Sequence, residues 1–174
     1  MNEVTAYSRR AKDLSVTRNR VAFNRWQVIM LLIMALILGS DAGLHGGELD
    51  FFVEAVRKNR SATVRDLIQQ GVDVNSRDAF GDNTGLHWAA IQGLAEMARM
   101  LIDNGADVDI RNSTGETPLH WAAKEGQKEL VVILIVHGAN VNARSKGSWT
   151  PLRWAEAHGY KEIARILMAA GGRR

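Results

Sequence analysis

Apolar side chains recur at helical spacing in three stretches of the chain, residues 94–104, 127–137 and 160–170. Their apolar positions align as Met97/Leu130/Ile163, Met100/Ile133/Ile166 and Leu101/Leu134/Leu167. A spacing of i, i+3 and i+4 places these side chains on one face of a helix. Helices this short are marginal on their own, so a neighbour must cover each apolar face. The pattern therefore predicts three short helices packed side by side.

A repeated heptapeptide precedes each of these helices. It reads TGLHWAA at 84–90, TPLHWAA at 117–123 and TPLRWAE at 150–156, which gives a period of 33 residues. Threonine is a good helix N-cap and proline is favoured at the first helical position, so another helix is predicted to begin at each threonine. The turn between the two helices of a unit is expected at Gly93, Gly126 and Gly159. A fixed period of this size is typical of stacked repeats.

The same alignment extends backwards to a fourth, divergent unit. Asp50 lies where the other units have threonine, and Gly71 closes this unit as Gly105 and Gly138 close the next two. Terminal repeats commonly depart from the pattern of the inner ones. We therefore expect a repeat domain over residues 48–172, with units at 50–83, 84–116, 117–149 and 150–172, and a first helix that begins at Asp50.

The motif TPLHWAA at a 33-residue period resembles the ankyrin repeat. The resemblance implies an all-α solenoid of about four helix-turn-helix units joined by β-turn finger loops. It also implies a non-catalytic module that binds a partner protein through its loop tips and the concave face of its first helices. His87 and His120 recur within the motif, and the resemblance gives them a structural role, hydrogen-bonded around the turn of the neighbouring unit, in preference to a metal site.

Positions that differ between the copies, together with large side chains on the loops, are the candidates for partner contacts. Arg77, Arg111 and Arg144 occupy one equivalent loop position and form a basic stripe. Phe80 and Trp149 are large apolar loop residues, so exposed anchors and local loop packing both remain open. The candidate partner-binding residues are Arg77, Phe80, Trp88, Arg111, Trp121, Lys124, Arg144, Lys146, Trp149 and Trp154.

The repeating tryptophans of this set have two interpretations. Trp88, Trp121 and Trp154 recur at the repeat period. They could form an aromatic ladder on the surface of the first helices, since tryptophan is enriched at binding hot spots. Packing between repeats is favoured, because residues fixed by the repeat usually belong to its framework.

A different irregularity marks the second helix of the third unit. Val132 and Val136 stand i, i+4 on its outer face, where the other copies carry polar or small residues. An exposed apolar pair of this kind predicts a small convex patch, a candidate for weak self-association or membrane contact. Coverage by long neighbouring side chains is the alternative.

Charge and composition limit the classes of function that the sequence supports. The chain has a formal net charge of +3, but residues 1–42 hold six Lys/Arg and three Asp/Glu, which leaves 16 of each sign from Gly43 onward. A neutral repeat body lacks the basic surface that nucleic-acid binding normally needs. The chain has no cysteine, and no metal-binding, nucleophilic or phosphate-binding motif is found. We therefore expect no catalytic residues, no cofactor and no bound metal.

Residues 1–42 carry a separate signal. Residues 1–25 are polar and basic, residues 26–38 are almost wholly apolar, and small residues follow up to Ala42. A basic region, a short apolar core and small residues are the three parts of a secretory signal peptide. The apolar stretch is shorter than the roughly 20 residues that span a bilayer. The sequence thus predicts export of the repeats to the periplasm or outside the cell, and an uncleaved signal-anchor that tethers them is the alternative.

Overall fold

The computed structural model describes residues 47–174, which form four pairs of antiparallel helices. In chain order these are α3 (Gly47–Arg57), α4 (Ser61–Gln69), α5 (Gly85–Gln92), α6 (Ala95–Asp103), α7 (Pro118–Lys124), α8 (Lys128–Val136), α9 (Pro151–Ala157) and α10 (Lys161–Ala169). None of these helices is long and apolar enough to cross a membrane. The signal peptide or signal-anchor predicted at 1–42 lies outside the described residues.

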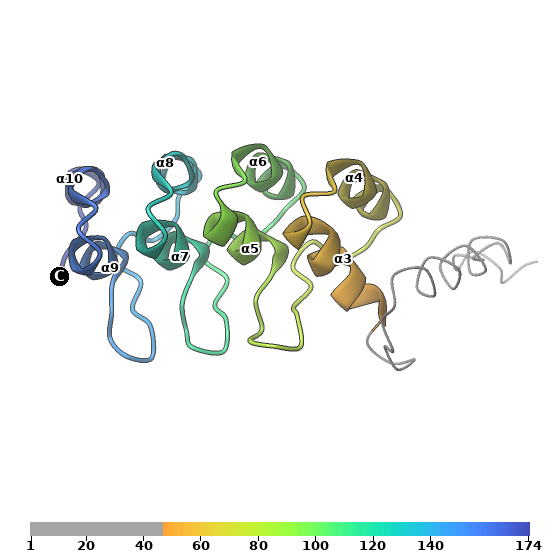
Figure 1. Cartoon of the computed structure of the whole chain (residues 1–174), viewed down its shortest axis with the longest axis horizontal. Helices are drawn as coiled ribbons and strands as arrows, with labels where there is room; N and C mark the ends of the chain where they lie inside the picture. The colour runs from red at the N-terminus through yellow and green to blue at the C-terminus, as the bar shows by residue number, and fades with distance from the viewer. Residues whose placement is uncertain (1–46) are drawn as a thin grey trace, which may run out of the picture. The chain divides into compact units, whose positions relative to one another are not determined.

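The helices stand in two parallel rows (Figure 1). The first helices of the units, α3, α5, α7 and α9, form the inner row, and α4, α6, α8 and α10 form the outer row. Long loops project from the inner row on the side away from the outer row (Figure 1). The expected all-α solenoid of four helix-turn-helix units is confirmed.

The apolar stripe expected from the sequence forms the core between the two rows. Leu101, Leu134 and Leu167 are completely buried, and so are Leu119 on α7 and Phe52 on α3. Removing a leucine-sized side chain from water contributes roughly 1.5–3 kcal/mol. Each unit therefore gains most of its stability from the neighbours that cover it, as the sequence predicts.

The turns within the units follow the expected glycines. Gly126 has a φ of +76°, and a Cβ there would lie 2.7 Å from the ring of Tyr160 in the next unit. A side chain at this position would therefore be strained in its backbone conformation and would displace the ring of Tyr160. In the divergent first unit Asn59, with a φ of +52°, takes this position, as the enrichment of asparagine in left-handed conformations allows.

The start of the first unit differs from the expectation. Helix α3 begins at Gly47, so Asp50 lies within its first turn and not at its N-terminus. The inner helices α5, α7 and α9 each begin directly after a threonine N-cap in extended conformation. The first unit lacks the threonine N-cap that precedes the other inner helices, and α3 is longer than they are.

Two buried histidines tie the second and third units to the loops that lead into the unit after each. Nδ1 of His87 accepts the backbone N–H of Thr84 at 3.1 Å, and its Nε2 lies 3.0 Å from the carbonyl oxygen of Glu116, the residue directly before the next unit. Because Nδ1 accepts a hydrogen bond, Nε2 carries the proton and donates to that carbonyl. His120 repeats this contact with the carbonyl oxygen of Trp149, also at 3.0 Å. Both histidines thus have the structural role that was expected.

The same burial keeps both histidines neutral. Burial lowers the pKa of His87 from 6.5 to about 4, against the opposing effect of its hydrogen bond to the Glu116 carbonyl. Burial also lowers the pKa of His120. A second proton would remove the acceptor at Nδ1 and break the contact with the threonine N–H.

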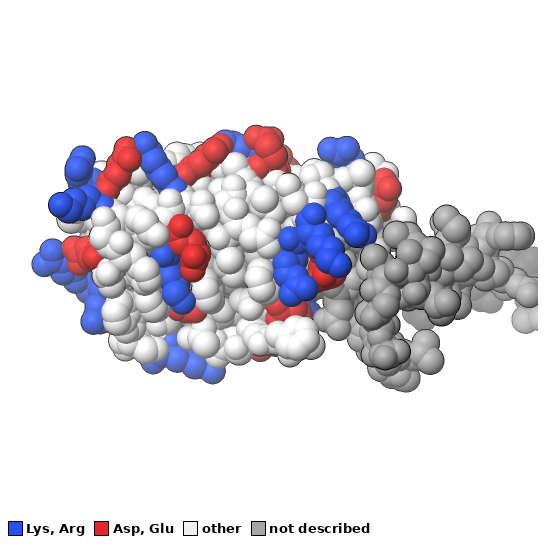
Figure 2. Space-filling view, in the orientation of Figure 1, with Lys and Arg blue, Asp and Glu red and all other residues white. Residues whose placement is uncertain are grey.

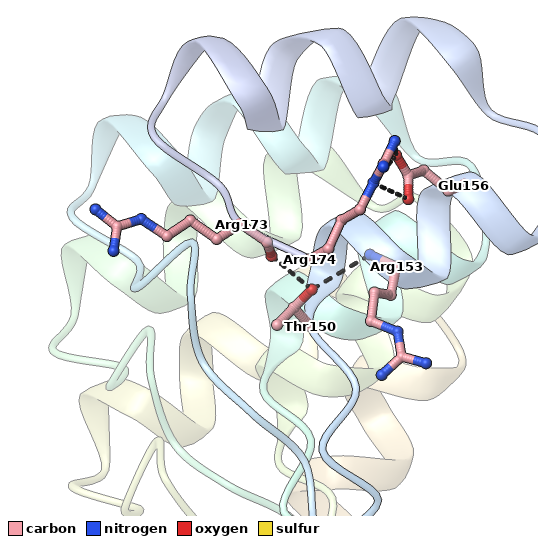
Figure 3. A network of polar contacts seen from close by, with 5 residues as sticks. All are labelled: Thr150, Arg153, Glu156, Arg173 and Arg174. Carbon is pink, nitrogen blue, oxygen red and sulfur yellow. Dashed lines mark hydrogen bonds and ion pairs between the residues drawn. The ribbon is translucent and has the colours of Figure 1, made fainter.

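Arg153 takes the place of the histidine in the fourth unit. Its backbone N–H donates to Oγ1 of Thr150 at 3.3 Å, and the Thr150 hydroxyl donates to the carbonyl oxygen of Arg173 at 3.0 Å (Figure 3). The guanidinium of Arg174 forms an ion pair with Glu156, with a shortest N···O distance of 2.9 Å. Here the threonine itself, in place of an imidazole, links the unit to the residues that follow it.

Candidate functional site

Three finger loops project from the inner row, at residues 77–84, 111–117 and 144–150, called here the first, second and third fingers. Backbone hydrogen bonds join them. The N–H of Ser113 donates to the carbonyl oxygen of Gly81, and the N–H of Lys146 donates to that of Thr114, both at 2.9 Å. The fingers therefore form one continuous row, and exposed Lys146 has a fixed backbone position within it.

The stripe of arginines contributes to this row. Nη1 of Arg77 donates to the carbonyl oxygen of Arg111 at 2.7 Å, and Nη1 of Arg111 donates to that of Arg144 at 2.6 Å. All three side chains are exposed and one repeat apart, as expected from the sequence. Arg77 and Arg111 also hold neighbouring fingers together, which a pattern of surface charge does not reveal.

The two large loop residues differ in their surroundings. Phe80 is 93% exposed on the first finger, in line with the expectation of an exposed residue. Trp149 is half-buried, with its ring centroid 4.5 Å from that of Trp154 and the guanidinium carbon of Arg153 4.7 Å from its ring. The interpretation of Trp149 as an exposed anchor is therefore wrong, because the third finger packs against α9.

The three repeating tryptophans are half-buried, in agreement with the packing role favoured for them. The indole N–H of Trp88 donates to Oδ2 of Asp78 in the first finger at 2.8 Å. The indole nitrogens of Trp121 and Trp154 are buried and have no hydrogen-bond acceptor within residues 47–174. Aspartate is absent from the equivalent finger positions of these two units, which hold Asn112 and Ser145.

Cations lie over these indole rings. The guanidinium carbon of Arg57 is 5.5 Å from the ring centroid of Trp88. Nζ of Lys124 is 4.2 Å from the ring centroid of Trp121 and 4.6 Å from that of Trp154. We use the term finger-side face for the surface made by the three fingers together with the indole rings and the cations that lie over them. These side chains are Arg57, Trp88, Trp121, Lys124, Trp149, Arg153 and Trp154.

Three residues of this face were not among the candidates from the sequence. Arg57 and Arg153 place their charges over tryptophan rings, and Asp78 fixes both its finger and an indole. The repeat alignment could have identified Arg57, because it occupies the position of Lys124 in its unit. Arg153 is marked in the sequence by its departure from the histidine of the other two copies. Asp78 carries no such signal, because its contact depends on how a finger folds against a helix.

The predicted convex patch is exposed. Val132 is 41% and Val136 76% exposed on the outer helix α8. In Figure 2, basic and acidic groups alternate along the outer row beside it, and Arg99 forms an ion pair with Glu129 across α6 and α8. The exposure agrees with the expectation from the sequence, and self-association through this pair stays a prediction.

The recurring histidines do not form a metal site. Among residues 47–174, no group of three or more His, Asp or Glu side chains is placed to hold a metal ion. Both recurring histidines are fully buried and hydrogen-bonded on both ring nitrogens. Two surfaces of residues 47–174 are therefore candidates for contact with a partner, the finger-side face and the exposed pair Val132 and Val136.

Comparison with known proteins agrees with this architecture. The family model for ankyrin repeats (3 copies) matches residues 52–145 and 86–173. The chain is 44% identical over 55 residues to serine/threonine-protein kinase 12 of Arabidopsis thaliana, covering 32% of this chain and 12% of the kinase. It is 35% identical over 91 residues to human neurogenic locus notch homolog protein 1, covering 52% of this chain and 4% of that protein.

A third similarity is to potassium channel AKT3 of rice, at 34% identity over 76 residues, which covers 43% of this chain and 8% of the channel. The chain thus spans only about a tenth or less of these relatives, and the similarity concerns their repeats. Proteins with ankyrin repeats generally use them to contact other proteins, and the repeats are typically non-catalytic. With matches that together run from residue 52 to residue 173, the chain belongs to the ankyrin repeat family.

Proposed function

We propose that this chain is a non-catalytic module that binds a partner protein through its finger-side face. The observation that carries the proposal is Phe80, a phenylalanine that is 93% exposed on a finger held in place by hydrogen bonds. A large apolar side chain on a rigid support is suited to fill a pocket in a partner. Arg144 and Lys146, exposed on the third finger, would add charged contacts at the rim.

A quantitative pull-down from cells that produce the protein tests this function. We expect the wild-type chain to capture a reproducible partner and Phe80→Ala to reduce its recovery by about tenfold or more, as for a hot-spot residue. Met168→Ala is the matched control, because Met168 is an apolar side chain 48% exposed on outer helix α10. Equal loss with both variants, or undiminished capture by Phe80→Ala, would contradict the proposal.

We further propose that the repeats act outside the cytoplasm. The supporting observation is the basic, apolar and small-residue order of residues 1–42. Mass analysis of protein from its native cells is expected to show a chain that begins near Gly43. A full-length chain recovered from the membrane would instead support the signal-anchor, with the repeats presented at the outer surface of the membrane.

A further inference from the structure

Five side chains on the third and fourth units form a column in which indoles and cations meet. Nζ of Lys124 lies between the rings of Trp121 and Trp154. The ring centroids of Trp154 and Trp149 are 4.5 Å apart, and the guanidinium carbon of Arg153 lies 4.7 Å from the Trp149 ring. We call Trp121, Lys124, Trp154, Trp149 and Arg153 the indole–cation column. The rings hold both cations in place electrostatically, with less freedom than ordinary surface side chains have.

The cations of this column have no counter-ion in the part of the chain that the structure describes. Within residues 47–174, no carboxylate lies within 4.0 Å of Lys124 or Arg153. The equivalent cation of the first unit, Arg57, is neutralised by Glu54 at 2.7 Å. In the third unit Trp121 occupies the position of that glutamate, so the neutralising carboxylate is replaced by an indole. The repeat alignment therefore shows a compensated charge in one unit and an uncompensated charge in another.

The surroundings add to this positive charge. Residues 124–174 contain nine Lys/Arg and four Asp/Glu. Three of the four carboxylates are already in ion pairs, Glu129 with Arg99, Glu156 with Arg174 and Glu162 with Lys128. The repeat body is neutral as a whole, yet its C-terminal part carries an excess of fixed positive charge. A surface of this kind attracts a negatively charged partner.

We infer that the indole–cation column binds carboxylate side chains of an acidic segment in a partner protein. The inference rests on the proposed function and adds the chemistry of the partner. A partner carboxylate beside Nζ of Lys124 would meet a cation that forms no ion pair within residues 47–174. The indole rings next to Lys124 would reduce the exposure of this new pair to water. A peptide fits better than a nucleic acid, because Arg77 and Arg111 are engaged with finger carbonyls and the basic surface does not extend along the whole array.

Selection of random dodecapeptides displayed on phage, with the full chain as the target, tests the inference. We expect the enriched sequences to contain two or more Asp or Glu residues. The best peptide is then synthesised together with a version in which Asp and Glu become Asn and Gln. The acidic peptide should bind about tenfold or more tightly than its neutral version, and raised salt should weaken only the acidic one.

Variants of the chain locate the contact. Lys124→Met keeps the length of the side chain and removes its charge, so binding of the acidic peptide should fall by about tenfold or more, while Lys124→Arg retains it. Lys161→Met, which changes an exposed lysine of α10 that forms no ion pair with any residue of 47–174, should bind as the wild type does. Equal melting temperatures of the variants exclude unfolding as the cause of a loss.

Several results would overturn the inference. Enriched peptides without carboxylates would do so, as would absence of enrichment or binding that is unchanged in Lys124→Met. Peptides that lose affinity in Phe80→Ala and keep it in Lys124→Met would reject the column and leave the proposed function intact. Equally tight, Lys124-dependent binding of a 20-nucleotide single-stranded DNA would assign the column to phosphate, and so also contradict the inference.

Discussion

Replacement of His87 by alanine is expected to lower the free energy of unfolding by about 3–5 kcal/mol, a large part of the stability of an ordinary domain. The imidazole is fully buried, accepts the N–H of Thr84 and lies 3.0 Å from the carbonyl oxygen of Glu116. Alanine would leave both backbone groups buried without a partner and open a cavity between two units. Chemical denaturation followed by circular dichroism measures the change.

The position of His87 also predicts how the protein will unfold. In a linear array each unit contacts only its neighbours, so a weakened interface lets the parts on either side unfold separately. We therefore expect a broader transition for His87→Ala than for the wild type. His158→Ala, at an exposed position directly after the last inner helix, should change stability by less than about 0.5 kcal/mol. A loss below about 1 kcal/mol in His87→Ala would show that the contact is dispensable.

Much of the fold could be predicted from the sequence, because the repeat determines both where the helices begin and end and which of them pack together. A threonine before α5, α7 and α9 and a glycine after each of them define the ends of these helices. The i, i+3, i+4 stripe defines which side is buried, and Leu101 and Leu134 are indeed fully covered. The prediction fails where the pattern itself fails, at Asp50, where the threonine of the other units is absent and α3 continues back to Gly47.

The candidate site could be predicted less completely, because its contacts cross between units. Sequence position shows that Trp149 lies on a loop, but its stacking on Trp154 depends on the angle at which the third finger meets α9. In the same way Lys124 and Trp154 belong to different units, and only the stacking of α7 on α9 brings the cation to the second ring. Alignment of the repeats shows equivalent positions, whereas the structure shows which positions touch.

Stability is expected to fall as the pH drops from about 6.5 to about 4, in the range set by the lowered pKa of His87. Below pH 6.5 the unfolded chain binds a proton at His87 that the folded chain does not accept until the pH approaches 4. Protonation therefore favours the unfolded state, and the loss stops once both states are protonated. A pKa difference of this size corresponds to about 3 kcal/mol, and His120 adds a loss in the same direction.

Comparison of wild type and His87→Gln isolates the effect from carboxylates that titrate in the same range. Glutamine three residues after a threonine N-cap can still accept the Thr84 N–H, but it does not titrate, so this variant should remain folded with a shallower dependence on pH. We expect the difference in free energy of unfolding between the two proteins to change by about 3 kcal/mol from pH 7 to pH 4. Parallel curves would mean that His87 accepts its second proton without losing its contacts, which would contradict the neutral imidazole assigned to it between Thr84 and Glu116. A steeper fall of the free energy of unfolding in the wild type would instead show that protonation of His87 weakens the contact between units. Because the stacked units position the fingers, acid would then also disturb the finger-side face.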